Sequence, residues 1–215
     1  MNNLLYKELR LVIHPFYYLT SLFAALILIP YWVYFVALMY FLFIAIPNIF
    51  TNAKAQNDTG FSVLLPVKKS DVVKARVTSM AALEILQMAV AAIFVAISVA
   101  ISPKGNVLID ANLAYLGCGL LLYGLFNLFF FPMYYKTGHK IGIPLMVGLT
   151  VFTIIGGIIE VLVVTVPAVA KVLDGNTPSA LVSQIPVLAA GIALFAGLTW
   201  LAYRMAAKNF EAVDL

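Results

Sequence analysis

An uncharged run of 35 residues, Phe16–Phe50, limits what this chain can fold into. A helix needs about 20 apolar residues to cross the hydrocarbon core of a bilayer, so this run predicts membrane-spanning helices. Composition agrees, because 64% of the 215 residues are hydrophobic and only 10% are charged. Soluble domains carry about 25% charged residues. With a mean hydropathy of +1.04, the sequence predicts an all-α integral membrane protein rather than a soluble or aggregating chain.

Prolines and polar interruptions divide the apolar sequence into six predicted spans. Pro30 splits the first run into a short and a longer span, which form either a tight hairpin or one bent, re-entrant pair. Aromatic residues at both ends of the short span are typical of the membrane interface. The predicted ranges are Phe16–Leu28, Tyr31–Phe50, Val77–Ser102, Ala111–Tyr135, Ile143–Val166 and Ile185–Tyr203.

The basic residues predict the orientation of these spans. Six spans place both termini on one side of the membrane, together with 11 of the 13 lysine and arginine residues. Only Lys104 and Lys171 fall on the other side. Such an excess of basic residues marks the cytoplasmic side. We therefore expect residues 1–215 to form one multi-pass domain with both termini in the cytoplasm.

Two segments outside the spans are also expected to be helical. Residues 1–15 contain no recognisable signal peptide, and their apolar and polar side chains fall on opposite helical faces. This pattern predicts an amphipathic helix in the cytoplasmic interface, with an ordinary charged tail as the alternative. Residues 167–184 are too apolar for a solvated tail, so they predict one or two short helices at the outer interface.

Few residues are arranged for catalytic chemistry. His14 and His139 lack the spacing of metal ligands, so no metal site is expected. The chain has no P-loop motif, and therefore we expect it to hold no nucleotide of its own. Cys118 is expected to be a packing residue. These observations predict a protein that is not an enzyme, binds no cofactor itself and does not bind nucleic acid.

Two carboxylates, Glu84 and Glu160, fall within predicted spans. An ionisable side chain at the bilayer centre costs about 2.5–3.5 kcal/mol on insertion scales and usually faces a partner or a cavity. Each carboxylate is therefore either part of a translocation path, a latch to another helix, or a locally bonded residue. For Glu84 the local partners would be Ser79 or Gln87.

Small residues recur at every fourth position of the last predicted span. This spacing lets another helix approach closely. We expect these residues to pack within the protomer, with a face for a second copy as the alternative. They are Ala189, Ala193 and Gly197.

The segment Asn57–Arg76 is the one long polar, basic stretch between spans, and it is the candidate functional site. Ser70 can cap a short helix over Ser70–Arg76, in which Asp71 near the start and Lys74 near the end suit the helix dipole. Apolar residues at 61–67 precede it. Apolar residues rimmed by charge indicate a protein interface, although lipid headgroups could also hold such a loop.

Several motifs resemble those of ABC-2-type transporter permeases, in particular exporters of phenol-soluble modulins or antimicrobial peptides in Gram-positive bacteria. Within the polar stretch they are N-D, L-L-P and a basic-Ser-Asp run that ends in a basic residue. Similar patches open the chain, follow the fourth span and close the chain. In order they are Leu5–Leu11, Asn57-Asp58, Leu64-Leu65-Pro66, Lys69–Arg76, Phe129–Gly142 and Arg204–Phe210.

The resemblance implies six spans, an N-terminal elbow helix at residues 1–15 and a coupling region at residues 51–76. It also implies a pair of permeases, identical or paralogous, in a bacterial cytoplasmic membrane. Two separate P-loop ATPase subunits would bind ATP and Mg²⁺. The implied ATPase-coupling residues are Asn57, Asp58, Phe61, Leu64, Leu65, Pro66, Lys69, Ser70, Asp71 and Lys74.

The function implied by this resemblance is ATP-driven export of an amphipathic or hydrophobic substrate, with a peptide favoured. No substrate-binding residue follows from it. Two other functions fit the residues: a membrane assembly or regulatory subunit that does not transport, and a proton-coupled carrier that depends on Glu84 and Glu160.

Overall fold

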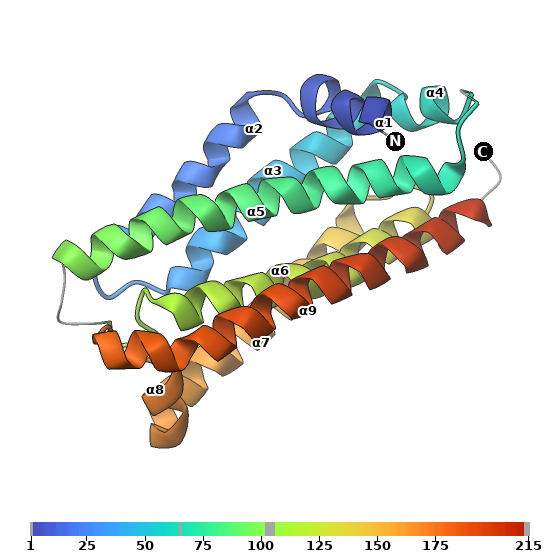
Figure 1. Ribbon diagram of the computed structural model, residues 1–215. Helices are drawn as coiled ribbons and strands as arrows, with labels where there is room; N and C mark the ends of the chain where they lie inside the picture. The colour runs from blue at the N-terminus through green and yellow to red at the C-terminus, as the bar shows by residue number, and fades with distance from the viewer. Residues whose placement is uncertain (1, 65, 102–105, 213–215) are drawn as a thin grey trace.

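A computed structural model describes residues 2–64, 66–101 and 106–212 of the chain, and these residues form helices without any strand (Figure 1). Five of the helices are long and apolar enough to cross a membrane. The prediction of an all-α integral membrane protein is therefore confirmed. The long helices are α3 (Tyr34–Ala55), α5 (Lys69–Ile101), α6 (Leu113–Lys136), α7 (Gly142–Thr165) and α9 (Pro178–Glu211).

The N-terminal segment forms a bent pair of helices that raises the number of candidate spans to six. Helix α1 (Asn2–Lys7) continues into the π-helical η1 (Glu8–Val12). After a bend of 80°, α2 (Phe16–Leu19) leads into η2 (Thr20–Leu28). Because η2 is a 3₁₀ helix, its nine residues extend about 18 Å, against about 14 Å for an α-helix. This geometry lengthens the predicted short span.

Several predicted boundaries were wrong. The second span begins at Tyr34 rather than Tyr31, whose left-handed φ of 60° excludes it from the helix. Most importantly, Ser70–Arg76 is not a separate helix, because α5 runs without a break from Lys69. The short helix between the second and third spans is instead α4 (Asp58–Leu64).

The predicted outer segment 167–184 is also divided differently. It contains α8 (Pro167–Leu173), and its last residues belong to α9, which starts at Pro178. Proline suits the first position of both helices, since an amide hydrogen is not needed there. Lys104, counted above for the orientation, lies outside the described residues. Helix α8 lies at one end of the bundle, and α4 lies at the other with α1 and the last turn of α9 (Figure 1).

Helices α6 and α9 approach each other through glycine. A Cβ atom on Gly191 of α9 would lie 2.2 Å from the carbonyl oxygen of Gly117 in α6, so only hydrogen fits there. The predicted packing stripe was wrong, because Ala189, Ala193 and Gly197 are exposed on another face of α9. A second copy of the chain remains the alternative partner for that stripe.

Near the α4 end, helices α3 and α6 pack through aromatic rings. The ring of Phe50 in α3 lies 4.7 Å from that of Tyr134 and 5.1 Å from that of Phe130, centroid to centroid. Edge-to-face pairs of this kind contribute about 0.5–1.5 kcal/mol beyond the area they bury. Their bulk fills the core near the α4 end.

Candidate coupling site at the α4 end

Helix α4 begins at a sharp turn after α3. Asn57 has a left-handed φ of 51°, which asparagine tolerates better than most residues, and its carbonyl accepts a hydrogen bond from Phe61 N at 3.0 Å. A Cβ atom on Gly60 would lie 2.6 Å from Asn57 Oδ1. Glycine at this position therefore lets the Asn57 side chain fold back over the first turn of α4.

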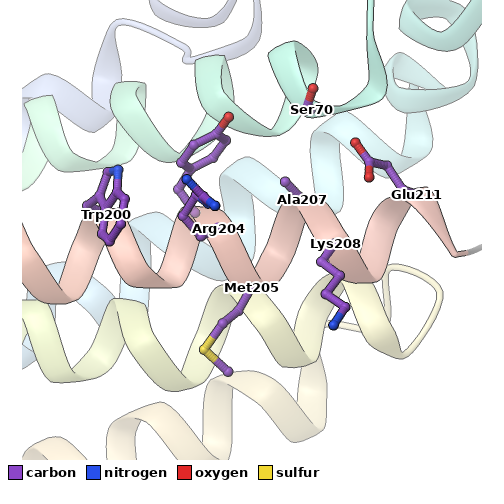
Figure 2. Close-up of a pocket in the computed structure, with 8 residues that line it drawn as sticks. Ser70, Trp200, Arg204, Met205, Ala207, Lys208 and Glu211 are labelled. Atoms are coloured by element: carbon purple, nitrogen blue, oxygen red, sulfur yellow. The ribbon is translucent and has the colours of Figure 1, made fainter.

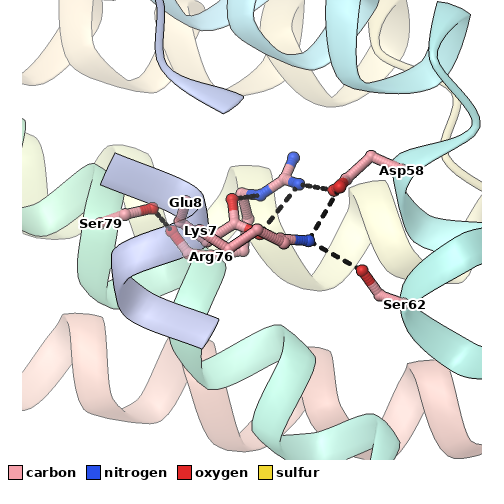
Figure 3. Close-up of polar contacts among 6 residues, drawn as sticks. All are labelled: Lys7, Glu8, Asp58, Ser62, Arg76 and Ser79. Atoms are coloured by element: carbon pink, nitrogen blue, oxygen red, sulfur yellow. Dashed lines mark hydrogen bonds and ion pairs between the residues drawn. The ribbon is translucent and has the colours of Figure 1, made fainter. Parts of the chain in front are cut away.

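Five residues from η1, α4, α5 and the end of α1 form an ion cluster, here called the Arg76 cluster (Figure 3). Arg76 Nη2 lies 2.6 Å from Asp58 Oδ2 and 3.2 Å from Glu8 Oε1, and its Nε pairs with Glu8 Oε2. Lys7 Nζ lies 2.8 Å from Asp58 Oδ1 and 3.1 Å from Glu8 Oε1, and it donates to Ser62 Oγ at 2.7 Å. The two cations and two anions balance.

The Arg76 cluster is largely shielded from solvent. The side chain of Glu8 is 1% exposed and that of Arg76 is 4% exposed. The guanidinium also lies over the ring of Phe50, 5.4 Å from its centroid. Removing one partner of a buried pair leaves an uncompensated charge and costs about 3–5 kcal/mol. The cluster therefore holds α4 firmly against the N-terminal segment and α5.

The other side of α4 presents apolar side chains to the surroundings. Phe61 is 61% exposed and Leu64 is 85% exposed, although both would be more stable in contact with another apolar surface. Pro66, which follows them, is also exposed. Helix α4 thus combines a buried charged face with an exposed apolar tip, here defined as Phe61 and Leu64.

The predicted coupling residues fall into two groups in the structure. Those at and before α4 lie around its turn and tip, and Leu65 lies outside the described residues. The others occupy the first turns of α5, where Lys69 Nζ lies 5.6 Å from the ring centroid of Phe210 in α9. Asp58, one of the implied coupling residues, bonds both Lys7 and Arg76 within the Arg76 cluster.

Sequence reasoning missed the roles of Lys7, Glu8, Ser62 and Arg76. It assigned Lys7 to the polar face of a surface helix and Arg76 to the end of a coupling helix. One feature of the sequence could have indicated this ion pair. Glu8 and Arg76 carry opposite charges and lie in two segments that were both expected at the cytoplasmic interface of the membrane. Their separation by 68 residues along the chain hid the contact.

A model of the ABC-2 family transporter proteins matches residues 3–211. This range includes every span and the Arg76 cluster. The chain belongs to the ABC-2 transporter family. It is thus the membrane-spanning permease component of a transporter, and permeases of this family generally work with ATPase partners. Searches of curated proteins and of solved structures gave no match.

The permease also has an open pocket of about 180 Å³ beside α4. Its only imidazole belongs to His139, in the turn between α6 and α7. Burial, together with the positive charges of Arg76 and Lys54, lowers the pKa of His139 below 6.5. The His139 imidazole in this pocket is therefore uncharged near pH 7. Its lining residues are Ala53, Lys54, Asn57, Gly60, Tyr134, Gly138 and His139.

Glu84 of the permease is bonded between helices rather than locally. Asn127 Nδ2 in α6 lies 2.7 Å from Glu84 Oε2 in α5 and 3.1 Å from Thr199 Oγ1 in α9. The local alternative was wrong for Ser79, whose hydroxyl donates to the Arg76 carbonyl at 2.8 Å. Glu84 and Asn127 are fully buried. The three side chains therefore connect three spans.

Glu160 of the permease lies at the opposite end, near α8. Its Oε2 accepts a hydrogen bond from Ile109 N at 2.9 Å. The neighbouring Asp110 receives hydrogen bonds from Asn106 N and Gly175 N. Glu160 thus attaches α7 to the segment before α6. Among the described residues, Glu84 and Glu160 share no hydrogen-bond partner, and no group of three or more His, Cys, Asp or Glu side chains could hold a metal ion.

Proposed function

We propose that this permease forms the membrane path of an ATP-driven exporter, and that the apolar tip of α4 docks its ATPase subunit. The observation that carries the proposal is the pairing of an exposed apolar tip with a buried ion cluster on one short helix. A partner that covers Phe61 and Leu64 gains apolar contact. Because the Arg76 cluster ties α4 to α5, movement of the partner would be transmitted to a span.

The distribution of basic residues supports a cytoplasmic position for the α4 end. Of the basic residues in the described part of the chain, only Lys171 belongs to the α8 end. Both termini and the ATPase would therefore lie in the cytoplasm. By resemblance, two permeases would assemble with two ATPase subunits, and those subunits would bind ATP and Mg²⁺.

For the substrate, we propose an amphipathic or hydrophobic molecule that moves outward, with a peptide favoured. The spans carry few charges, which suits an apolar cargo. The preference for a peptide rests on the motif resemblance to peptide exporters. This preference is tested with inside-out vesicles, whose cytoplasmic face points outward. ATP is added outside the vesicles, and the uptake of a labelled amphipathic peptide is compared with that of a neutral lipid analogue.

The docking proposal is tested by co-purifying the permease with its ATPase subunit. The double variant Phe61→Asp/Leu64→Asp should reduce ATPase recovery at least about tenfold, since two charges replace the apolar contact. Val107→Asp is the control, because Val107 is also 67% exposed but lies near the α8 end. If the double variant keeps both ATPase association and export, the tip is not the docking surface.

The same preparation separates the alternatives. A permease that binds the ATPase without changing its hydrolysis rate and without export would be an assembly or regulatory subunit. A carrier driven by protons would transport without ATP and would lose that transport in Glu84→Gln/Glu160→Gln. The separate hydrogen-bond networks of these two carboxylates favour the ATP-driven function over a proton relay.

A further inference from the structure

A second charged surface lies at the α4 end, in an open groove of about 500 Å³ along the last turns of α9 (Figure 2). Ser70, near the start of α5, also lines the groove. The groove contains two cations and one anion, with an indole and a phenol on the membrane side. Its lining residues are Ser70, Trp200, Tyr203, Arg204, Met205, Ala207, Lys208 and Glu211.

The two basic side chains of this groove are exposed to the surroundings. Arg204 and Lys208 are exposed, and neither forms an ion pair with any described residue. The guanidinium of Arg204 lies 5.3 Å from the ring centroid of Trp200, which orients it. Its hydrogen-bond donors are therefore held in place and remain free for an anion.

The charge of the groove matches a phosphodiester. Arg204 and Lys208 against Glu211 leave one net positive charge, and a phosphodiester carries one negative charge. Inorganic phosphate carries more negative charge near pH 7, and Glu211 would oppose it. Arginine binds phosphate oxygens through paired hydrogen bonds. The hydroxyl groups of Ser70 and Tyr203 provide further donors at the edges of the groove.

Exposed apolar side chains continue from the groove along α9. Trp200 is 58% exposed, Met205 44% and Leu201 41%. Tryptophan is enriched where a helix leaves the bilayer, at the level of the lipid headgroups. A ligand with a phosphodiester head and an apolar tail would bury these side chains and neutralise the cations together.

From these observations we infer that the groove binds an anionic phospholipid from the leaflet at the α4 end. The phosphodiester is bound by Arg204, with Lys208 one turn farther along α9, and an acyl chain lies against Trp200. The contact would bridge the start of α5 and the end of α9. The bound lipid therefore belongs to the seam between these two helices, away from the tip of α4.

Trp200 itself reports binding. The chain has two tryptophans, so Trp32→Phe leaves Trp200 as the only one. The Trp32→Phe protein, full length and in neutral detergent, is titrated with phosphatidylglycerol that carries brominated acyl chains, because bromine quenches a tryptophan it contacts. We expect saturable quenching, and much weaker quenching by brominated phosphatidylcholine.

Arg204→Gln/Lys208→Gln in this background should weaken phosphatidylglycerol binding about 30-fold, since each basic residue near an anionic surface contributes about 1 kcal/mol. Lys136→Gln/Lys140→Gln is the matched control. It removes two exposed cations at the same end but outside the groove, and should change binding less than about threefold. Arg204→Lys should weaken phosphatidylglycerol binding by an intermediate amount. The positive charge is kept, but the planar guanidinium with its paired hydrogen-bond donors is lost.

Three results would overturn the inference. Equal losses in the two double variants would show that only overall charge matters. Equal quenching by the two lipids would show that the groove does not recognise an anion. Displacement of the brominated lipid by inorganic phosphate at a comparable concentration would show a site for free phosphate rather than lipid.

Discussion

Arg76, two turns into α5, pairs with Asp58 at the first position of α4, with Nη2 and Oδ2 separated by 2.6 Å. The two positions are 18 residues apart along the chain. The pair joins the only short helix between the second and third spans to the third span itself, within the described part of the chain. It therefore provides a stiff connection between the exposed tip of α4 and the membrane.

Removing the charge of Arg76 should destabilise the permease. Arg76→Gln leaves Glu8 without its main partner and should lower the free energy of unfolding by about 3–5 kcal/mol. Lys74→Gln removes a cation from the same turns of α5 at an exposed position, and should change it by less than about 0.5 kcal/mol. Thermal unfolding in detergent compares the two variants. Equal midpoints would show that the Arg76 cluster does not stabilise the fold.

A double-mutant cycle measures the contact between Arg76 and Asp58 directly. Asp58→Asn, Arg76→Gln and the double variant should give an interaction energy above about 1 kcal/mol, since close charged partners couple strongly. Asp58→Asn should also reduce the stimulation of the ATPase by substrate while leaving its co-purification intact. Additive stabilities, within about 0.3–0.5 kcal/mol, would mean that the two side chains act independently.

Substitution of Gly191 should disrupt the contact between α6 and α9. Gly191→Ala places a methyl group against the backbone of Gly117, so the helices must move apart, at a cost of about 1–3 kcal/mol. Gly197→Ala adds the same methyl group to α9 where no atom lies within 4 Å. Its stability should be unchanged or slightly higher, because alanine favours a helix over glycine. The order of the two unfolding midpoints tests this packing.

Loss of the Asn127 side chain should be costly because Glu84 is buried. Asn127→Ala leaves the Glu84 carboxyl and the Thr199 hydroxyl without their shared donor, which should cost about 1–3 kcal/mol or more. Asn48→Ala removes an exposed amide whose bond, at 2.7 Å, goes to the Ile44 carbonyl. Its effect should be small. Comparable losses in the two variants would argue against an interhelical role for Glu84.

His139 should produce a pH dependence of stability. Its pKa is lowered in the folded permease, so below about pH 6.5 the unfolded chain binds more protons than the folded one. Stability should fall as pH drops through this range, and should level off once pH passes below the lowered pKa. His139→Gln should flatten this part of the curve, measured between pH 7.5 and 5. His14→Gln, which replaces the other histidine, is the control.

The sequence alone determined the class of protein and most of its helices. Long apolar runs predict spans because a bilayer leaves a backbone no other partner for its hydrogen bonds, and this rule depends on composition rather than on contacts. The motifs between Leu5 and Phe210 were enough to indicate the ABC-2 family. The charged stretch Asn57–Arg76 does contain a short helix, but it lies at Asp58–Leu64 and not at the predicted Ser70–Arg76.

Only the tertiary structure decided which side chains meet. Local pattern placed the packing stripe at Ala193, but the close approach lies at Gly191, because the direction from which a neighbouring helix arrives is not encoded in one helix. The sequence likewise did not show that Asp58 pairs with Arg76, 18 residues away, in an ion cluster that is largely shielded from solvent. Charge and apolarity are local properties of a sequence, but burial and pairing depend on which distant segments fold against each other.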